Sequence, residues 1–107
     1  MRETTIAERY ARALLDIGIE KKNAQQLEDE LVRIQRLFHN SEDLRRLFSN
    51  PNFNNEIRKN VLAELLERSV ISPTCRNFSL LLVDKKRIRS LDSIIDNYRD
   101  TSTLIVA

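Results

Sequence analysis

Apolar residues recur at helical spacing along most of the chain, and one stretch, residues 73–87, is apolar on every side. On a wheel that turns roughly 100° per residue, its apolar side chains point in opposite directions. They are Cys75, Phe78, Leu80, Leu81, Leu82 and Val83. A helix apolar all round is usually enclosed by others, so we predict the central helix of an all-α domain, capped by Ser72 and opened by Pro73. An ordinary core helix without a binding role is an equal alternative.

Residues 6–20 predict a first helix whose apolar arc is roughly 240° wide, although one buried face needs only about 100°. Thr5 and Glu8 have the spacing of a capping box at its start. Two neighbouring strips make up most of the arc, namely Ile6, Tyr10, Ala13 and Ile17, and Ala7, Ala11, Leu14 and Gly18. Two interpretations remain open. The helix is either wedged between two neighbours of its own domain, or it leaves one strip uncovered as a binding groove.

The other apolar patterns predict four more helices. Their expected N-caps are Asn23 (with Gln26), Ser41, Asn54 or Asn55, and Ser90. Phe53 is expected to tuck into the core from a loop. The expected core positions are Leu27, Leu31, Ile34, Phe38, Leu44, Leu47, Phe48, Ile57, Val61, Leu62, Leu65, Leu66, Leu91, Ile94, Ile95 and Tyr98. Together with the first and fifth helices, these patterns predict a six-helix bundle.

The end of the chain departs from this pattern. Residues 99–103 are polar and interrupt the helical period, while residues 104–107 are apolar and mostly β-branched. An exposed apolar tail of this kind has no evident use in a finished protein. We therefore expect residues 1–100 to form one helical domain, and residues 101–107 to be a linker or the first strand of a further, missing domain.

Composition narrows the class of protein. The 107 residues suffice for one domain with a real core, and one glycine with two prolines is too few turn residues for a β-sandwich. Charged residues at 32% and hydrophobic residues at 41% are typical of a globular protein. No apolar run is long enough to span a bilayer, so we expect no direct membrane insertion. The net charge of +2 is too small to indicate nucleic-acid binding.

No catalytic constellation can be assembled from the sequence. His39 and Cys75 are the sole residues of their types and lie on different segments, which gives no nucleophile–base pair and no disulfide or zinc spacing. Gly18 is the only glycine, so a glycine-rich phosphate loop is absent. We therefore expect no enzymatic activity, no cofactor and no metal. The basic run at residues 85–89 complements the negative end of a helix dipole.

Four motifs appear in the order and spacing of a known family. They are Ile6-Ala7-x-x-Tyr10-Ala11-x-Ala13-Leu14, Ser49-Asn50-Pro51, Ser72-Pro73-x-x-x-Asn77-Phe78-x-x-Leu81-Leu82 and Lys86-Arg87-Ile88. From Ile6 to about Tyr98, the chain resembles the N-terminal domain of the δ subunit of F-type ATP synthase, the counterpart of the mitochondrial oligomycin-sensitivity-conferring protein. Many members of that family have Asn-Gly before the arginine, where this chain has Lys85 and Lys86.

The resemblance implies a six-helix bundle with a non-catalytic task in the stator, or peripheral stalk, of the synthase. Its partner would be the amphipathic N-terminal helix of an α subunit, held in a groove between the first and fifth helices so that the catalytic head resists rotation. A C-terminal domain beyond Ala107 would join the b subunits, in a complex at the cytoplasmic face of the bacterial inner membrane. We expect the groove residues to be Ile6, Tyr10, Ala13, Leu14, Ile17, Thr74, Asn77, Phe78 and Leu81.

Two alternatives remain at the level of sequence. A small helical adaptor or nucleic-acid-binding domain would use Arg76 and the basic run at residues 85–89, and its affinity for phosphates would fall steeply with salt. A freestanding bundle would instead pair its extra apolar faces in a homodimer. An apolar groove for a helix would show little salt dependence.

Overall fold

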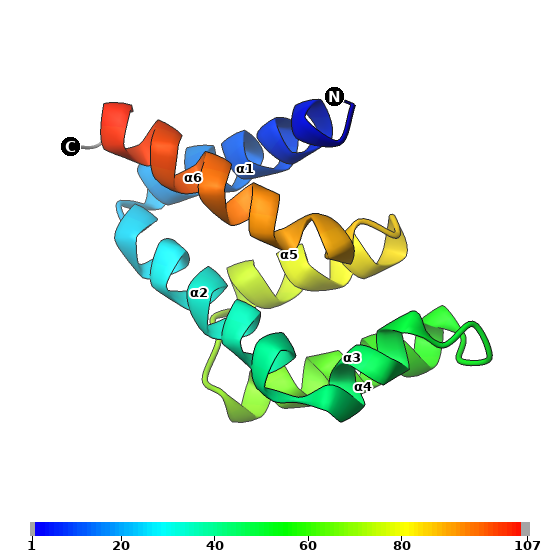
Figure 1. Cartoon of the computed structure of the whole chain (residues 1–107). Coiled ribbons are helices and arrows are strands. Elements are labelled where there is room, and N and C mark those ends of the chain that lie inside the picture. Colours follow the sequence, from blue (N-terminus) through cyan, green and yellow to red (C-terminus); the bar gives the residue numbers. More distant parts are fainter. Residues whose placement is uncertain (1, 106–107) are drawn as a thin grey trace.

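Six α-helices and one 3₁₀ turn make up almost all of residues 2–105, the part of the chain that the computed structural model describes (Figure 1). In chain order they are α1 (Arg2–Lys21), α2 (Ala24–Asn40), α3 (Glu42–Ser49), α4 (Asn55–Arg68), α5 (Pro73–Asp84), the 3₁₀ turn η1 (Ile88–Ser90) and α6 (Leu91–Ile105). The described residues contain no strand. The predicted all-α six-helix bundle is confirmed.

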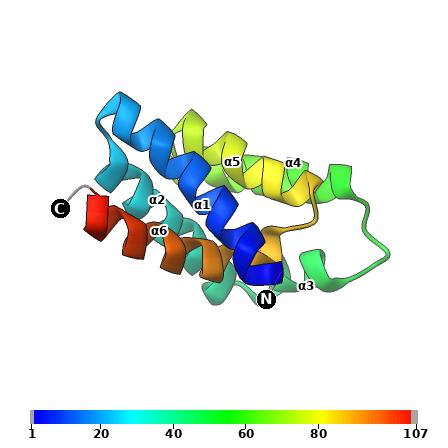
Figure 2. The same cartoon turned by 90° about the horizontal axis from the view of Figure 1, so that it is seen from above.

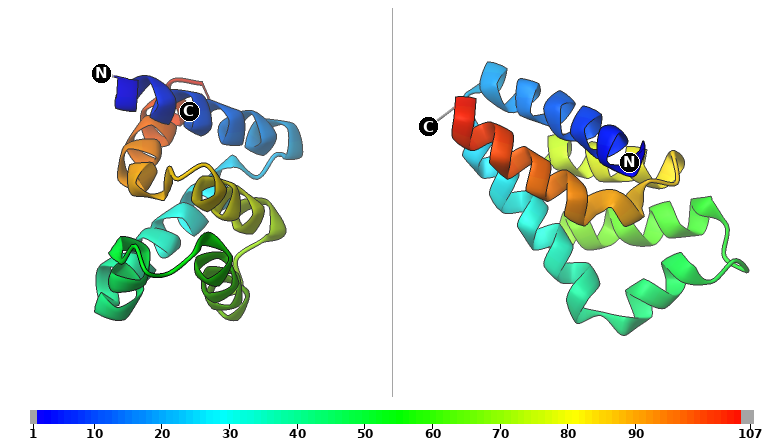
Figure 3. Two further views of the ribbon diagram at one scale, coloured as in Figure 1. Left: turned by 90° about the vertical axis from the view of Figure 1, so that its right-hand side faces the viewer. Right: turned by 45° about the horizontal axis from the view of Figure 1, so that its top comes forward.

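The helices pack around α2 and α5. α1 packs along α6 and against α2, and α2 in turn contacts α3, α5 and α6, whereas α4 packs mainly on α5. Figure 2 shows α1 crossing the bundle with α6 on one side and α5 on the other. Both panels of Figure 3 show α3 and α4 at the end of the bundle remote from α1. The α1–α5 region is therefore one face of the molecule, and the α3–α4 region is another.

The central position predicted for the fifth helix is confirmed. Its buried residues lie on several sides of α5, and they are Cys75, Phe78, Ser79, Leu82 and Val83. One strip stays open, since Asn77 is exposed and 42% of Leu81 is accessible to solvent. This open strip borders α1, where a groove is described below.

The two apolar strips of α1 differ in burial. One strip is packed between neighbouring helices, as the first interpretation had it, and the other is uncovered, as the second had it. The buried strip consists of Ala7, Ala11, Leu14 and Gly18, and the open strip of Tyr10, Ala13 and Ile17, which are half-buried or exposed. A Cβ atom on Gly18 would lie 2.8 Å from Cα of Ala24, so the close approach of α1 to α2 requires glycine. One strip of α1 is therefore wedged into the bundle, and the other is left uncovered.

Three helices end in the same motif, with a residue other than glycine in the left-handed conformation. Lys22, Val70 and Lys86 have φ angles of 60°, 59° and 58°. The next residue's N–H returns to a carbonyl five residues earlier, as from Ile71 to Leu66 at 3.1 Å. Glycine is usual at this position because it carries no Cβ. The turn after α5 is thus made with a lysine, Lys86, in the left-handed conformation.

Of the predicted N-caps, two are confirmed by a side-chain hydrogen bond, two lack such a bond, and Thr5 lies inside α1. Ser41 Oγ accepts the backbone N–H of Leu44 at 3.1 Å, and Asn54 Oδ1 accepts that of Ile57 at 2.9 Å. Asn23 makes no capping hydrogen bond, and its Oδ1 is buried without a hydrogen-bond partner in the described part of the chain. Ser72 occupies the N-cap position of α5 but makes no side-chain capping hydrogen bond, and its hydroxyl donates to the Glu30 carboxylate of α2.

Helix boundaries differ from the prediction at three places. α1 extends beyond Thr5 toward the N-terminus, and a 3₁₀ turn, η1, which ends at Ser90, directly precedes α6. Residues 99–105 continue α6, although a polar break was expected there. The polar residues are accommodated because Arg99, Asp100 and Thr103 are exposed and Thr101 and Ser102 are only half-buried, on a helix packed on α1. Arg99 also pairs with Glu28 at 3.2 Å. The apolar residues 106–107 lie outside the described residues, and the domain boundary at residue 100 stays a prediction.

The predicted burial of Phe53 and of part of α4 is wrong. Phe53 is 39% exposed, and Ile57 and Val61 are also open to solvent, whereas Leu62 and Leu66 are fully buried. The reason is that α4 packs mainly on α5, so one face of α4 is covered and the other is free.

Candidate functional site

A groove of about 420 Å³ runs between α1 and α5. Its lining residues are Tyr10, Ala13, Leu14, Ile17 and Lys21 from α1, and Thr74, Asn77, Phe78 and Leu81 from α5. The two helices are antiparallel here, because Tyr10 lies beside Phe78 while Lys21 reaches Thr74. The groove therefore follows the helix axes over several turns, a shape suited to an extended or helical segment.

The floor and the walls of the groove have different exposure. Leu14 and Phe78 are buried and form the floor, whereas Ile17 and Leu81 are 36% and 42% exposed and form opposite walls. Between them Ala13 is exposed, and its methyl group is too small to fill the space. The groove thus offers apolar surface at a depth that a side chain from another molecule can reach.

The groove stays open because its two helices are held by other neighbours. The backbone of α1 packs on α6 and α2, and that of α5 on α4 and α2. Two side-chain contacts between α1 and α5 border the groove. The rings of Tyr10 and Phe78 meet edge to face with centroids 6.2 Å apart, and Lys21 Nζ lies 3.4 Å from Thr74 Oγ1. Neither contact fills the space between the walls.

The structure brings together all but one of the residues expected in this groove. Ile6 is half-buried and does not line it, because it lies one turn N-terminal to Tyr10. Lys21 lines the groove and was missed. The expectation followed the apolar strip and stopped at Ile17, although Lys21 is the next position on that strip, four residues on. Helical spacing alone would have included it.

The N-terminal turn of α5, which carries Thr74, is anchored by a buried carboxylate. Glu30 of α2 is 3% exposed and accepts hydrogen bonds from Ser72 Oγ at 2.6 Å and Gln26 Nε2 at 3.1 Å. Burial raises the pKa of the Glu30 carboxyl, but these hydrogen bonds outweigh it, and the net pKa lies below its usual value. The ionised carboxylate therefore ties α2 to the start of one groove wall.

Cys75 directly follows Thr74 on α5 and takes no part in the groove surface. Its thiol is buried and approaches the carbonyl oxygen of Leu27, with Sγ 3.7 Å away. Burial, followed by the nearby negative charge of Glu30, raises the pKa of the Cys75 thiol. The side chain consequently stays protonated and serves packing.

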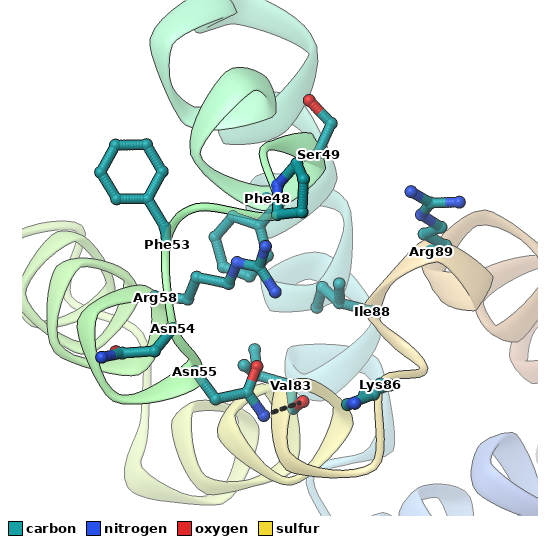
Figure 4. Close-up of a pocket in the computed structure, with 11 residues that line it drawn as sticks. Phe48, Ser49, Phe53, Asn54, Asn55, Arg58, Val83, Lys86, Ile88 and Arg89 are labelled. Carbon is teal, nitrogen blue, oxygen red and sulfur yellow. Dashed lines mark hydrogen bonds between the residues drawn. The ribbon is translucent and has the colours of Figure 1, made fainter.

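A second hollow, of about 770 Å³, lies beside the C-terminal end of α5 and is lined in part by the basic run at residues 85–89 (Figure 4). Figure 4 shows Lys86 and Arg89 on either side of Ile88, with Arg58 reaching in from α4. Arg58 is already engaged, since it donates to the carbonyl oxygens of Leu47 at 3.1 Å and Asn50 at 2.7 Å. The three cations therefore do not converge on one free phosphate-sized position.

Metal ligation and membrane insertion find no support in the described residues. Within residues 2–105, no group of three or more His, Cys, Asp or Glu side chains is placed to hold a metal ion. No described helix is long and apolar enough to cross a membrane.

The fold and the apolar groove define the class of protein. The chain is a small all-α bundle whose apolar groove lies between two helices, with no metal-ligating cluster in residues 2–105 that the structure describes. Within this class, residues 6–103 match the family model described as ATP synthase delta (OSCP) subunit, and the chain belongs to that family. The resemblance stated from the sequence motifs is confirmed.

Curated relatives support this assignment. The chain is 37% identical over 98 residues to the ATP synthase subunit delta of Trichlorobacter lovleyi, covering 92% of this chain and 54% of the relative. It is 39% identical over 94 residues to the ATP synthase subunit delta of Syntrophus aciditrophicus, covering 88% and 52%. The chain thus spans about half the length of the curated relatives it matches.

Solved structures share the fold. A chain in a cryo-EM structure of the Polytomella F-ATP synthase, in rotary substate 1C, superposes with a TM-score of 0.80 at 22% identity, covering 88% of this chain and 82% of that chain. Another, in rotary substate 1B, gives 0.74 at 19% identity, covering 91% and 85%. At these identities the likeness establishes the arrangement of helices.

Proposed function

We propose that this chain is the N-terminal domain of a peripheral-stalk subunit of an F-type ATP synthase, and that its α1–α5 groove binds the N-terminal helix of an α subunit. The observation that carries the proposal is the groove itself. It is apolar and elongated, and it is lined by eight of the nine residues expected from the sequence, all except Ile6. Membership of the family supports the wider assignment to the synthase.

The geometry suits recognition of an amphipathic helix. Such a helix lays apolar residues at i, i+3, i+4 and i+7 into a groove, and association removes their surface from water. Tyr10 offers a broad ring at the rim, of the kind enriched at interface hot spots, while Ala13 leaves room for the incoming side chains. The walls formed by Ile17 and Leu81 would cover the flanks of the partner helix.

The task would be mechanical and non-catalytic. Rotation of a central shaft drags on the catalytic head, and a peripheral stalk must hold the head still. A C-terminal domain following this chain would join the b subunits, so that the complex is peripheral at the cytoplasmic face of the bacterial inner membrane. Direct insertion of the chain into the membrane is not part of this function, and neither is nucleic-acid binding.

The test is calorimetric titration of the chain with a peptide of the cognate α-subunit N-terminus, at low and moderate salt. We expect saturable binding with one peptide per chain and a weak salt dependence. Sedimentation of the chain alone tests the homodimer alternative. Absence of peptide binding by a folded, monomeric chain would overturn the proposal. Tight DNA or RNA binding that falls steeply with salt would favour the basic run instead.

A further inference from the structure

Lys21 is the one charged residue among those that line the α1–α5 groove. Its ammonium group lies 3.4 Å from Thr74 Oγ1, a long and solvent-exposed hydrogen bond. Within the described residues, no carboxylate lies at ion-pairing distance from it. Some other cations of the bundle, such as Arg12, Lys59 and Arg99, pair with a carboxylate at 3.0–3.2 Å, but none of these three lines the groove. Lys21 thus brings an uncompensated positive charge to one end of an apolar groove.

We propose that Lys21 favours partner helices with an Asp or Glu carboxylate at the end of the apolar strip, by pairing with that carboxylate. The inference rests on the proposed function, namely that the groove binds an amphipathic helix. Charge complementarity with Lys21 requires an acidic residue on the partner helix at this end of the groove. The other eight lining residues are uncharged and cannot distinguish an acidic helix from a neutral one.

The position of Lys21 relates the charge to the apolar contacts. It follows Ile17 by four residues, one helical turn, on the same strip of α1. The carboxylate of the partner should therefore lie about one turn beyond the partner's last apolar residue at this end. On binding, the long contact with Thr74 would be supplemented by a charge-assisted hydrogen bond, which is shorter and stronger than a neutral one.

The pair would contribute more to selectivity than to affinity. Apolar faces of different amphipathic helices resemble one another, so an apolar groove alone leaves the direction and register of the bound helix weakly defined. A single charge at one end favours one register and disfavours a partner with a cation there. Because Lys21 is exposed, we expect the pair to change affinity by about two- to fivefold, and less at high salt.

The experiment is a double-mutant cycle measured by calorimetry. The chain and its Lys21→Gln variant are titrated with the cognate α-subunit N-terminal peptide, and with peptides in which each Asp or Glu is changed singly to Asn or Gln. We expect one such peptide to bind the parent chain about two- to fivefold more weakly, yet to bind Lys21→Gln as the unchanged peptide does. Lys21→Arg should retain the parent preference, because the charge is kept.

Lys22→Gln is the matched control. It removes the same charge one residue further on, at a position that does not line the groove. If Lys22→Gln changes peptide preference as Lys21→Gln does, the effect is one of net charge and the inference fails. It also fails if every peptide binds the parent and Lys21→Gln alike, although the proposed function would then stand. If no peptide binds the folded parent chain, the proposed function itself fails.

Discussion

Tyr10 of α1 and Phe78 of α5 meet edge to face, with ring centroids 6.2 Å apart and 73° between the ring planes. The two residues have different surroundings, because Phe78 belongs to the buried core whereas Tyr10 is half-buried at the rim of the groove. The pair therefore connects the stability of the bundle to the shape of its open face. Phe78 supports the fold, whereas the exposed part of Tyr10 is available to a partner.

Phe78 and Leu82 should mainly support the fold. Leu82 is fully buried, and Phe78 nearly so. Truncation of either to Ala removes apolar contacts and leaves a cavity, so we expect the free energy of unfolding to fall by about 2–5 kcal/mol. The measurement is denaturant unfolding followed by circular dichroism.

Leu81→Ala is the control for Leu82→Ala. It makes the same chemical change at the next residue, which is 42% exposed. We expect a loss below about 1 kcal/mol, because little buried surface is removed. Equal losses for the two variants would contradict the assignment of Leu81 to the groove wall and of Leu82 to the core.

The periodicity of apolar residues was sufficient to predict the six helices and most of the groove. Tyr10, Ala13 and Ile17 recur at helical spacing, so their shared strip follows from the sequence. That the strip would remain uncovered depends on which helices pack on α1, and these are α6 and α2. Periodicity cannot say which neighbour covers which strip, so both interpretations of α1 were open until the packing was known.

Predictions of helix caps and helix ends from neighbouring residues failed where residues distant in sequence make contacts. Ser72 was expected to cap α5, but its hydroxyl donates to Glu30, which lies 42 positions away in sequence. The short hydrogen bond to this charged acceptor orients the Ser72 hydroxyl, and the position of Glu30 depends on tertiary packing that the local sequence does not show. Likewise, residues 99–103 are polar enough to suggest a break, yet they continue α6, which packs on α1.

Val70→Gly should stabilise the fold. Val70 has a φ angle of 59° and is 79% exposed, so its side chain strains the backbone without burying apolar surface. The left-handed conformation costs about 1–2 kcal/mol for a residue with a Cβ, while glycine loses about 0.5–1 kcal/mol in chain entropy. We expect a net gain of about 0.5–1 kcal/mol in the free energy of unfolding.

Val61→Gly makes the same substitution inside α4, where the backbone is helical. It should destabilise the chain by about 0.5 kcal/mol or more, since glycine is the poorer helix former. Opposite signs for the two variants in the same unfolding assay would establish that backbone conformation decides the outcome. If Val70→Gly also destabilises, the strain at that turn is compensated by contacts of the valine.

Glu30 should make the stability depend on pH. The carboxyl group has its ordinary pKa in the unfolded chain and a lower one in the folded chain. The folded state therefore gains stability above the ordinary pKa, and loses it as the pH falls through the folded pKa. Glu30→Gln should lower the free energy of unfolding by about 1–3 kcal/mol at neutral pH and weaken this acid dependence.

The control for Glu30 is Glu64→Gln, which alters an exposed carboxylate paired with Arg68 at 2.6 Å. Surface pairs of this kind contribute little, so we expect a change below about 1 kcal/mol. Unfolding curves recorded from neutral pH down to about pH 3 compare the three chains over the range in which carboxyl groups titrate. An acid dependence unchanged in Glu30→Gln would show that the buried carboxylate does not carry it.

Tyr10→Ala should weaken binding of the α-subunit peptide more than it weakens the fold. The ring is half-buried at the rim, where a partner would cover its exposed part. We expect a loss of about 1–3 kcal/mol in binding free energy, the range of a moderate hot spot. Calorimetric titration and a thermal melt of the same sample separate the two effects. Binding that is unchanged within error would place the contact elsewhere on the bundle.

Ala13→Trp is the sharpest test of the groove, because it changes the space without removing an existing contact. Ala13 is exposed and lines the groove between the walls formed by Ile17 and Leu81. An indole at this position would project into open space, so the domain should fold normally. The ring would occupy the position of the incoming helix, and we expect peptide binding to weaken by more than tenfold, or about 1.4 kcal/mol.

Glu8→Trp provides the matched control, since it adds the same ring to an exposed position of α1 that does not line the groove. This variant should bind the peptide as the parent chain does, with a similar melting temperature. If Ala13→Trp unfolds the domain, Ala13 belongs to the packed core. If it folds and binds normally, the partner helix lies on another face, and the open strip of α1 serves some other contact.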